Sequence, residues 1–423
     1  MKKQILSTSA IALGVAMAAP ASAQEWNVDV GGYFFGALGF SDISGSASNA
    51  GGQLAGNDYE GLQYNKDAEI SFVPSIALDN GLTFGANIQF ETDDGSDMDE
   101  VYMFIEGDTL GTIEVGSENS AGAKLMVGSP SVGGLPVNSG SISGFVPFSP
   151  SAPAAALSGT GPAAGSVSIV NSFVGAGYSR FTEVGGGLYG NNDIARINYF
   201  TPSFNGLRLG VAFAPGTDSG SDGNSGLVDT NNSTLSDIFD LGLRYDQSFG
   251  ATDISLSARW GTGELDEAGI NGLLAVAGIT AADGVTPVVV EDDAETWGVG
   301  AQVGFNAFTF GAAYYENENG LTGGAFDEEG YQFGVTYDLA GPWMIGLEYL
   351  NGEGSHGAGR GEDEMEVIKL AASRNLGPGV DWAVSLLYTE IDAADAATGG
   401  LLNGTAGTDI EATTISTSIS LSF

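Results

Sequence analysis

Five basic side chains share the polar side of segments in which polar and apolar residues alternate: Arg196, Arg208, Arg244, Arg259 and Lys369. Asn198 follows Arg196 two residues later, and Ser257 precedes Arg259 by two residues. Because successive side chains of a β-strand point to opposite faces, we expect all five to point toward a polar interior and to form one basic wall. In an alternative interpretation they are ordinary interior residues that pair with Asp240, Asp246 and Asp253.

Acidic side chains lie on the polar side of other segments, at Asp29, Glu91 and Glu114, and Glu118 begins a long connection. We expect these four to form an acidic side opposite the basic wall. Opposite charges that face each other across a narrow aqueous passage create a transverse field. Such a field aligns water and dipolar solutes, and it favours polar solutes over apolar ones.

A calcium site is a weaker hypothesis for the run DDGSDMDE, whose candidate ligands are Asp93, Asp94, Asp97 and Asp99. Clustered carboxylates suit a hard cation, but the run lacks the complete twelve-residue calcium-loop pattern. Solvated loop charge is the alternative interpretation. No other cofactor is expected, since the chain has no Cys and its one histidine, His356, lies between glycines without visible partners. We therefore predict no catalytic centre.

The net charge of −41, from 53 acidic and 12 basic residues, argues against a nucleic-acid partner, which would need a basic surface. The same charge predicts a field that enriches cations near the protein. Residues 1–23 have the pattern of a cleaved signal peptide, with Lys2 and Lys3 before an apolar stretch and Ala21-Ser22-Ala23 as the cleavage site. We expect residues 24–423 to form one domain.

Alternation with a period of two residues runs through the whole mature chain. In the last segment, Ile415, Ile419 and Phe423 lie on one face, and Ser416 and Ser420 lie on the other. Most such segments are about nine to eleven residues long, which is the length of a tilted membrane-spanning strand. The pattern predicts an all-β fold, although a soluble β-sandwich would also alternate in this way.

The connections between these segments alternate in length, which favours a barrel over a sandwich. Short turns are predicted at 79–81, near Asp108, and at 201–206, 248–251, 306–307, 340–342 and 376–379. Long connections are predicted at about 41–65, 93–98, 118–192, 214–237, 261–294, 317–329, 351–364 and 391–409. This rhythm predicts sixteen antiparallel strands, of which the first and the last pair to close the sheet. Closure removes the unpaired edges that lipid does not tolerate.

Three segments and the last residue carry a resemblance to a known family: GLTFGANIQFETDDG (81–95), LGTIEVGSENSAGA (110–123), INYFTPSFNGLRLGVAF (197–213) and the terminal Phe423. The chain resembles the general diffusion porins of Gram-negative outer membranes, most closely the alphaproteobacterial type, over essentially its whole mature length. The resemblance implies a homotrimer, short periplasmic turns and long extracellular loops. It also implies a third loop (118–192) that folds into the lumen as a constriction.

The resemblance further implies that Phe423 is an assembly signal, read by the outer-membrane assembly machinery. The expected surroundings are outer-membrane lipid and lipopolysaccharide. The third loop is long for the family and contains a Pro/Ala/Ser/Gly-rich tract at 144–166. For this reason no constriction residue is transferred from the family individually.

The expected function is a water-filled, cation-preferring channel for passive diffusion of ions and small hydrophilic solutes. The alternative is a substrate-specific, saturable outer-membrane channel. That class generally has an aromatic slide along the pore, whereas the inward aromatic residues predicted here are few, chiefly Tyr33, Phe35 and Tyr315. A barrel enzyme would need a Ser–His pair inside the wall, and an adhesin would need a passenger domain or plug. Neither is predicted.

Overall fold

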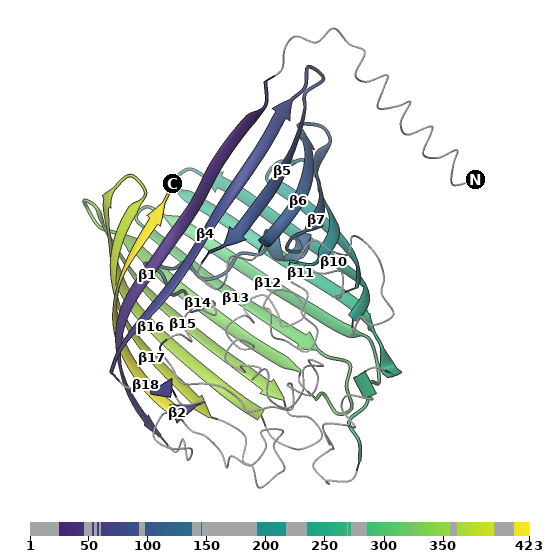
Figure 1. The fold of residues 1–423 in the computed structure, drawn as a ribbon. Helices are drawn as coiled ribbons and strands as arrows, with labels where there is room; N and C mark the ends of the chain where they lie inside the picture. Colours follow the sequence, from purple (N-terminus) through teal and green to yellow (C-terminus); the bar gives the residue numbers. More distant parts are fainter. Residues whose placement is uncertain are drawn as a thin grey trace.

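The computed structural model describes residues 25–45, 53–54, 57–58, 61–92, 98–137, 145, 193–216, 235–268, 270–271, 286–325, 327–355, 362–392 and 410–423. These residues form a closed barrel of sixteen strands, in which each strand pairs with its neighbours in antiparallel orientation (Figure 1). The predicted all-β barrel with sixteen strands is confirmed. Within the described residues, no helix is long and apolar enough to cross a lipid bilayer.

The barrel strands are β1 (Asn27–Gly45), β4 (Gly61–Ala77), β5 (Leu82–Glu91), β6 (Met98–Gly107), β7 (Gly111–Ser117), β8 (Ala195–Phe200), β9 (Leu207–Gly216), β10 (Leu235–Phe249), β11 (Thr252–Leu265), β12 (Ala294–Phe305), β13 (Phe308–Glu318), β14 (Glu328–Asp338), β15 (Trp343–Ser355), β16 (Glu362–Gly377), β17 (Val380–Asp392) and β18 (Ile410–Ser422). Short turns join the strands at one end of the barrel, here called the short-turn end. At the opposite, long-loop end the connections are long, and one of them contains the small sheet of β2 (Gln53–Leu54) and β3 (Asn57–Asp58).

Because polar and apolar residues alternate along each strand, the outer face of the barrel wall is apolar and the inner face is largely polar. In β18, Ile415 is 63% exposed on the outer face, whereas its neighbour Thr414 is 1% exposed on the inner face. The outer stripe of most strands consists of large apolar side chains such as Phe40 and Leu62. Burying such a stripe in lipid is favourable, and the polar residues of the other face then line the interior.

Aromatic side chains at the long-loop end of the outer face donate hydrogen bonds to nearby carboxylates. The Tyr349 hydroxyl lies 2.7 Å from Glu366 Oε2, and Tyr388 lies 3.1 Å from Glu390 Oε2. Tyr314 and Trp260 donate in the same way to Glu329 and Glu295. Aromatic rings with a polar group prefer the membrane–water interface. These pairs therefore mark one boundary of the membrane-spanning band.

The seam between β1 and β18 closes the barrel. Their register runs from Tyr33 opposite Ser422 to Gly45 opposite Ile410. At the short-turn end, Gly32 and Phe423 exchange two backbone hydrogen bonds of 3.1 Å each. The Phe423 ring lies directly against Gly32, where a Cβ would be 3.1 Å from the ring. The terminal residue is thus the last rung of the seam.

Deleting Phe423 removes both of these backbone hydrogen bonds and the ring that covers Gly32. We predict that the deletion lowers the amount of folded barrel in membrane extracts several-fold, while secretion across the inner membrane is unaffected. Heat-dependent electrophoretic mobility of the extracted protein measures the folded fraction. Phe423→Trp keeps the last rung and an aromatic ring, so it serves as the control. Normal levels of folded barrel after deletion would contradict the assignment of Phe423 as an assembly signal.

Candidate functional site

The third loop, which connects β7 to β8, follows the inner wall of the barrel across most of its strands. It begins with the short helix α2 (Ala121–Leu125), for which the Ser120 side chain accepts a hydrogen bond from the Ala123 N–H as the N-cap. Leu125 packs against Phe200 and Ala212 on the wall. Further along, Leu135 packs with Phe35, Ala37 and Phe145 beside β1. The predicted folding of the third loop into the lumen is confirmed for residues 118–137, and most of the remainder of 118–192 lies outside the described residues.

Glycines on the inner face of successive strands leave the space that the loop occupies. A Cβ on Gly242 would lie 2.8 Å from Gly122 Cα, and a Cβ on Gly300 would overlap the Val127 carbonyl oxygen. Such positions occur on six of the strands that follow β8, so the loop lies on a band that we call the glycine track: Gly210, Gly242, Gly300, Gly311, Gly334 and Gly346. The loop backbone is therefore in contact with the wall and does not cross the lumen at this level.

A buried ion pair fixes the first part of this loop. The Arg259 guanidinium pairs with the Asp240 carboxylate, with Nε 3.0 Å from Oδ2. Both groups also bond to the Ser120 hydroxyl, at 2.7 Å from Asp240 Oδ2 and 2.9 Å from Arg259 Nη2. Further along, the Val127 N–H donates to Ser257 Oγ at 3.0 Å. Arg259 therefore holds the loop and does not face open water.

A second ion pair, between β15 and β16, fixes the loop at a separate part of the wall. Lys369 Nζ lies 2.9 Å from Glu348 Oε1, and both side chains are 0% exposed. The Ser131 hydroxyl donates to Glu348 at 2.9 Å and accepts from Lys369 at 3.0 Å. The backbone N–H groups of Val132 and Val137 also point to the Glu348 carboxylate, at 3.4 and 3.3 Å. Removing one partner from such a buried pair is costly, because the other charge is left without compensation.

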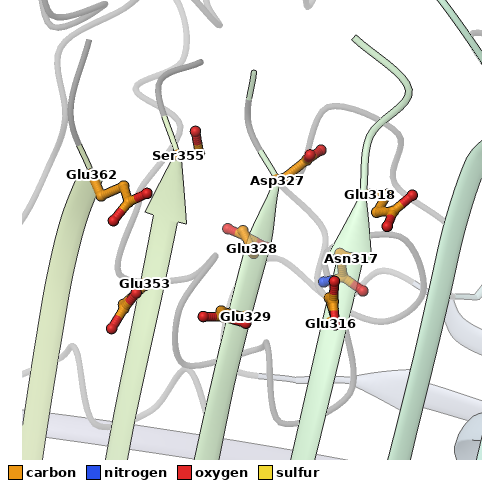
Figure 2. A pocket seen from close by; sticks show the side chains of 9 residues that line it. All are labelled: Glu316, Asn317, Glu318, Asp327, Glu328, Glu329, Glu353, Ser355 and Glu362. Atoms are coloured by element: carbon orange, nitrogen blue, oxygen red, sulfur yellow. The ribbon is translucent and has the colours of Figure 1, made fainter. Parts of the chain in front are cut away.

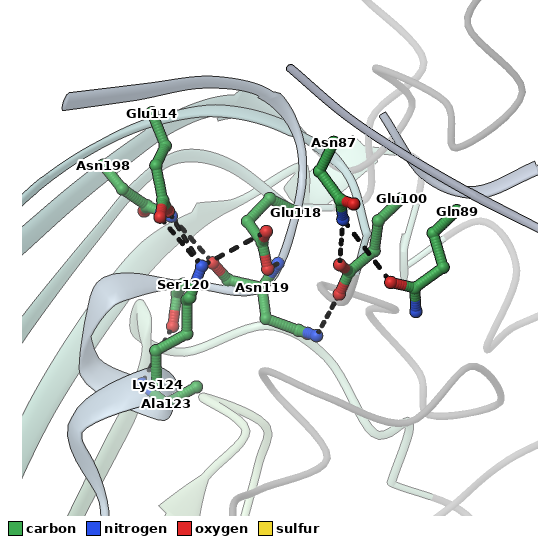
Figure 3. A network of polar contacts seen from close by, with 10 residues as sticks. All are labelled: Asn87, Gln89, Glu100, Glu114, Glu118, Asn119, Ser120, Ala123, Lys124 and Asn198. Carbon is green, nitrogen blue, oxygen red and sulfur yellow. Dashed lines mark hydrogen bonds and ion pairs between the residues drawn. The ribbon is translucent and has the colours of Figure 1, made fainter. Parts of the chain in front are cut away.

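Lys124, on α2, holds the root of the loop between two carboxylates (Figure 3). Its ammonium lies 2.9 Å from Glu114 Oε2 on β7 and 3.2 Å from Glu118 Oε2. Asn198 Nδ2 donates to Glu114 Oε2 at 3.1 Å. Burial raises the pKa of the Glu118 carboxyl, the Glu114 charge raises it further, and Lys124 opposes both. At the root of the loop, the positive charge of Lys124 thus compensates the negative charges of two buried carboxylates.

All five predicted basic residues lie on the inner face, but they differ in access to the lumen. Arg196, Arg259 and Lys369 are 1%, 5% and 0% exposed. Two of these, Arg259 and Lys369, lie beneath the third loop, as described above. Arg208 and Arg244 are partly exposed and stand directly opposite each other on β9 and β10. Only two of the five therefore remain as basic groups in the open lumen.

The structure brings only two of the four predicted acids together. Glu114 and Glu118 meet at Lys124 and are buried. Asp29 lies near the start of β1, beyond the Gly32–Phe423 rung, where it accepts from Asn27 Nδ2 at 2.8 Å. Glu91 stands at the other end of the wall, on β5 opposite Glu69. Asp29 and Glu91 are therefore not part of one acidic side with the other two.

Acidic residues gather instead at the rim of the long-loop end (Figure 2). A pocket of about 180 Å³ is lined by Asn317, Ser355 and seven acids: Glu316, Glu318, Asp327, Glu328, Glu329, Glu353 and Glu362. A neighbouring pocket of about 370 Å³ includes Glu291, Asp292, Asp293 and Glu295. No basic residue lines either pocket. The rim is therefore a strongly negative surface.

The calcium hypothesis concerns a run of which the structure describes only a part. Asp93, Asp94 and Asp97 lie outside the described residues, and Asp99 accepts from Gln89 Nε2 at 3.2 Å. Among the residues that are described, no group of three or more acidic, His or Cys side chains has the geometry to hold a metal ion.

Inside this rim, part of the barrel interior is filled by buried apolar residues. Leu235 and Ile238 on β10, Ile270, Val288 and Leu321 form one buried cluster with their neighbours. The cluster joins the ends of β9, β10 and β12 to residues of two long connections, 266–293 and 319–327. The polar interior predicted from alternation therefore does not continue to the long-loop end on this side.

Sequence reasoning missed the residues that position the third loop. Lys124 lies in a loop, where strand alternation gives no direction for a side chain. A local signal was present, since Ser120 precedes Ala121, Ala123 and Leu125, and a serine before good helix formers predicts a helix start. The inner-face glycines were a second signal, because glycine in a strand often marks the close approach of another backbone.

Comparisons with known proteins agree with this architecture. The model of a family described as Gram-negative porin matches residues 7–394. No curated protein sequence matches the chain. Among solved structures, the anion-selective porin from Comamonas acidovorans has a TM-score of 0.56 at 15% identity, covering 94% of this chain and 100% of that chain. OmpT of Vibrio cholerae, in a trimer form, has a TM-score of 0.56 at 9% identity, covering 94% and 99%. The outer membrane channel DcaP of Acinetobacter baumannii has a TM-score of 0.55 at 12% identity, covering 96% and 99%.

Replacing Lys124 with Met leaves Glu114 and Glu118 buried without their cation. We predict a loss of about 1–3 kcal/mol in the free energy of unfolding near neutral pH, measured by denaturant unfolding in lipid vesicles. Because burial raises the pKa of Glu118 in the folded state, its carboxyl group costs stability at pH values above its pKa in the unfolded chain. The loss should therefore become smaller as the pH falls and Glu118 takes up a proton. Lys124→Arg, which keeps the charge, is the control. Equal stability of Lys124→Met and wild type at both pH values would contradict this role.

Proposed function

Because the chain belongs to the Gram-negative porin family, we propose that it forms a water-filled channel for passive diffusion of ions and small hydrophilic solutes. The protein is an outer-membrane β-barrel, so its short-turn end is periplasmic and its long-loop end is extracellular. We further propose that the channel prefers cations. The alternative function, a substrate-specific saturable channel, differs in that its flux levels off as the solute concentration rises.

The acidic extracellular rim is the observation that carries the cation preference. The two rim pockets are lined by carboxylates from five neighbouring strands, β12 to β16, and the connections between them, without a basic residue. An acidic rim concentrates cations near the mouth over roughly one Debye length, about 10 Å at 0.1 M salt. The net charge of −41 has the same sign.

The inner-face arginines are the opposing consideration, and the third loop weakens their effect. Arg259 is buried in a pair with Asp240, and Arg244 Nε lies 2.8 Å from Asp246 Oδ2. The similar porin from Comamonas acidovorans is anion-selective. Selectivity therefore does not follow from the barrel architecture, and in this chain we infer it from the exposed charges.

We also propose a homotrimer, for which the trimer form of the similar OmpT from Vibrio cholerae gives support. Further proposals are cleavage of residues 1–23 as a signal peptide and contact of the outer face with lipid and lipopolysaccharide. The last proposal is that the outer-membrane assembly machinery recognises Phe423. The position of Phe423 at the closing seam, where it exchanges two backbone hydrogen bonds with Gly32, supports this proposal.

The reversal potential across a KCl gradient tests the selectivity. We predict a cation-selective potential in planar bilayers at low salt, which weakens toward 1 M as the Debye length falls to about 3 Å. Replacing Arg208 and Arg244 together with Ser should raise the cation preference, because it removes two partly exposed basic groups from the inner wall. A potential that indicates chloride preference at low salt would overturn the proposal. A barrel that folds but carries no ion current would remove the channel function itself.

The cation preference should also decline in mild acid. Burial, together with the nearby Glu318 and Glu316, raises the pKa of Asp327 to about 6. As the pH falls through this value, the Asp327 carboxylate takes up a proton and the rim loses a negative charge. We predict a smaller cation-selective potential just below this pH than just above it. The matched variant Asp327→Asn should show a flatter pH dependence, and an unchanged profile in that variant would contradict the assignment.

A further inference from the structure

A polar pocket of about 510 Å³ lies on the inner wall at the periplasmic end, beneath the turns that join β4 to β5, β6 to β7 and β8 to β9. Its charged lining residues are Arg208, Glu106 and Asp108, and its hydroxyl groups include those of Thr83, Thr112 and Ser203. The volume lies within the range of small-molecule sites, which is about 300–1,000 Å³. The pocket therefore offers charges of both signs and several hydroxyl groups to a small solute.

The charges of this pocket do not neutralise one another. Within the described part of the chain, Arg208, Glu106 and Asp108 form neither an ion pair nor a side-chain hydrogen bond with any residue. Arg244, which stands opposite Arg208 on the neighbouring strand, does pair with Asp246 at 2.8 Å. Arg208 is thus the one cation of the pocket, and its guanidinium is available to a ligand.

The Phe200 ring positions the Arg208 side chain. The guanidinium carbon lies 4.8 Å from the centre of the ring, a cation–π contact that orients the planar group while its N–H donors stay free. A guanidinium in a fixed plane matches a carboxylate through two parallel hydrogen bonds. On the acidic side, Glu106 and Asp108 accept hydrogen bonds, as an ammonium group requires.

We propose that this pocket is a binding site for small zwitterions, namely amino acids or short peptides, at the periplasmic exit of the channel. Arg208 binds the solute carboxylate, Glu106 and Asp108 bind its ammonium group, and the threonine hydroxyl groups bind its amide or polar side chain. The site lies about 7 Å along β9 from Gly210, on which α2 rests, because two strand residues span that distance. A solute that has passed the third loop reaches it next. This location on the permeation path rests on the proposed channel function, whereas binding itself does not.

Binding of glycylglycine to the full-length mature protein in detergent tests the site, with saturation-transfer NMR as the readout. Wild type should bind the dipeptide saturably, and Arg208→Gln should weaken binding by at least about tenfold, the effect of losing a charge-assisted pair. Glu106→Gln combined with Asp108→Asn should weaken it similarly. The control is Arg374→Gln, which removes the same charge from the outer face at the same end, where Arg374 packs over Trp343.

Two further probes, acetate and glycinamide, each carry only one of the two charges, and both should bind more weakly than glycylglycine. In single-channel recordings, periplasmic glycylglycine should reduce the ion current of wild type and not that of Arg208→Gln. Equal binding by wild type and Arg208→Gln, or acetate binding as tight as that of the dipeptide, would overturn the zwitterion site. A barrel that binds the dipeptide through Arg208 but carries no current would support the site and overturn the channel function.

Discussion

The pairing of every backbone N–H and C=O group inside a membrane is the constraint on which the rest of this structure depends. In lipid, an unpaired strand edge costs several kcal/mol for each group. The sheet must therefore close, and the rung between Gly32 and Phe423 completes the closure at one end. Closure sets the circumference of the lumen by strand number. What remains variable is how the interior is filled, and here that depends on the third loop.

The third loop fills the interior from the wall inward. Small inner-face residues give its backbone room, and two buried ion pairs, Arg259 with Asp240 and Lys369 with Glu348, hold it at separate positions. Polar interior residues therefore have two different roles. Some hold the loop and are withdrawn from water, and others, such as Arg208, remain available to solutes. The charge that the pore presents to solutes therefore comes from the interior residues that do not bind the third loop.

Much of the fold was predictable from the sequence, because alternation and turn residues are local signals. The short turns at 79–81 and 306–307 follow from the turn residues between alternating segments, and the inward direction of Arg244 follows from strand periodicity. The burial of Lys369 does not, since it depends on Ser131, which is far away in the chain. The same holds for Lys124, whose position is set by tertiary contacts. Local periodicity therefore predicts which face a residue occupies, but not what covers that face.

The path of the third loop has a consequence for the order of folding events. Residues 120–135 rest on strands from β9 onward, and at their far end Leu135 contacts Phe35 on β1. The inner-wall surface that this segment contacts is therefore complete only after the last hairpin has paired with β1. The contact of Leu135 with Phe35 can thus form only in chains in which β1 has taken its place in the closed barrel, so the fully docked segment is a local mark of closure.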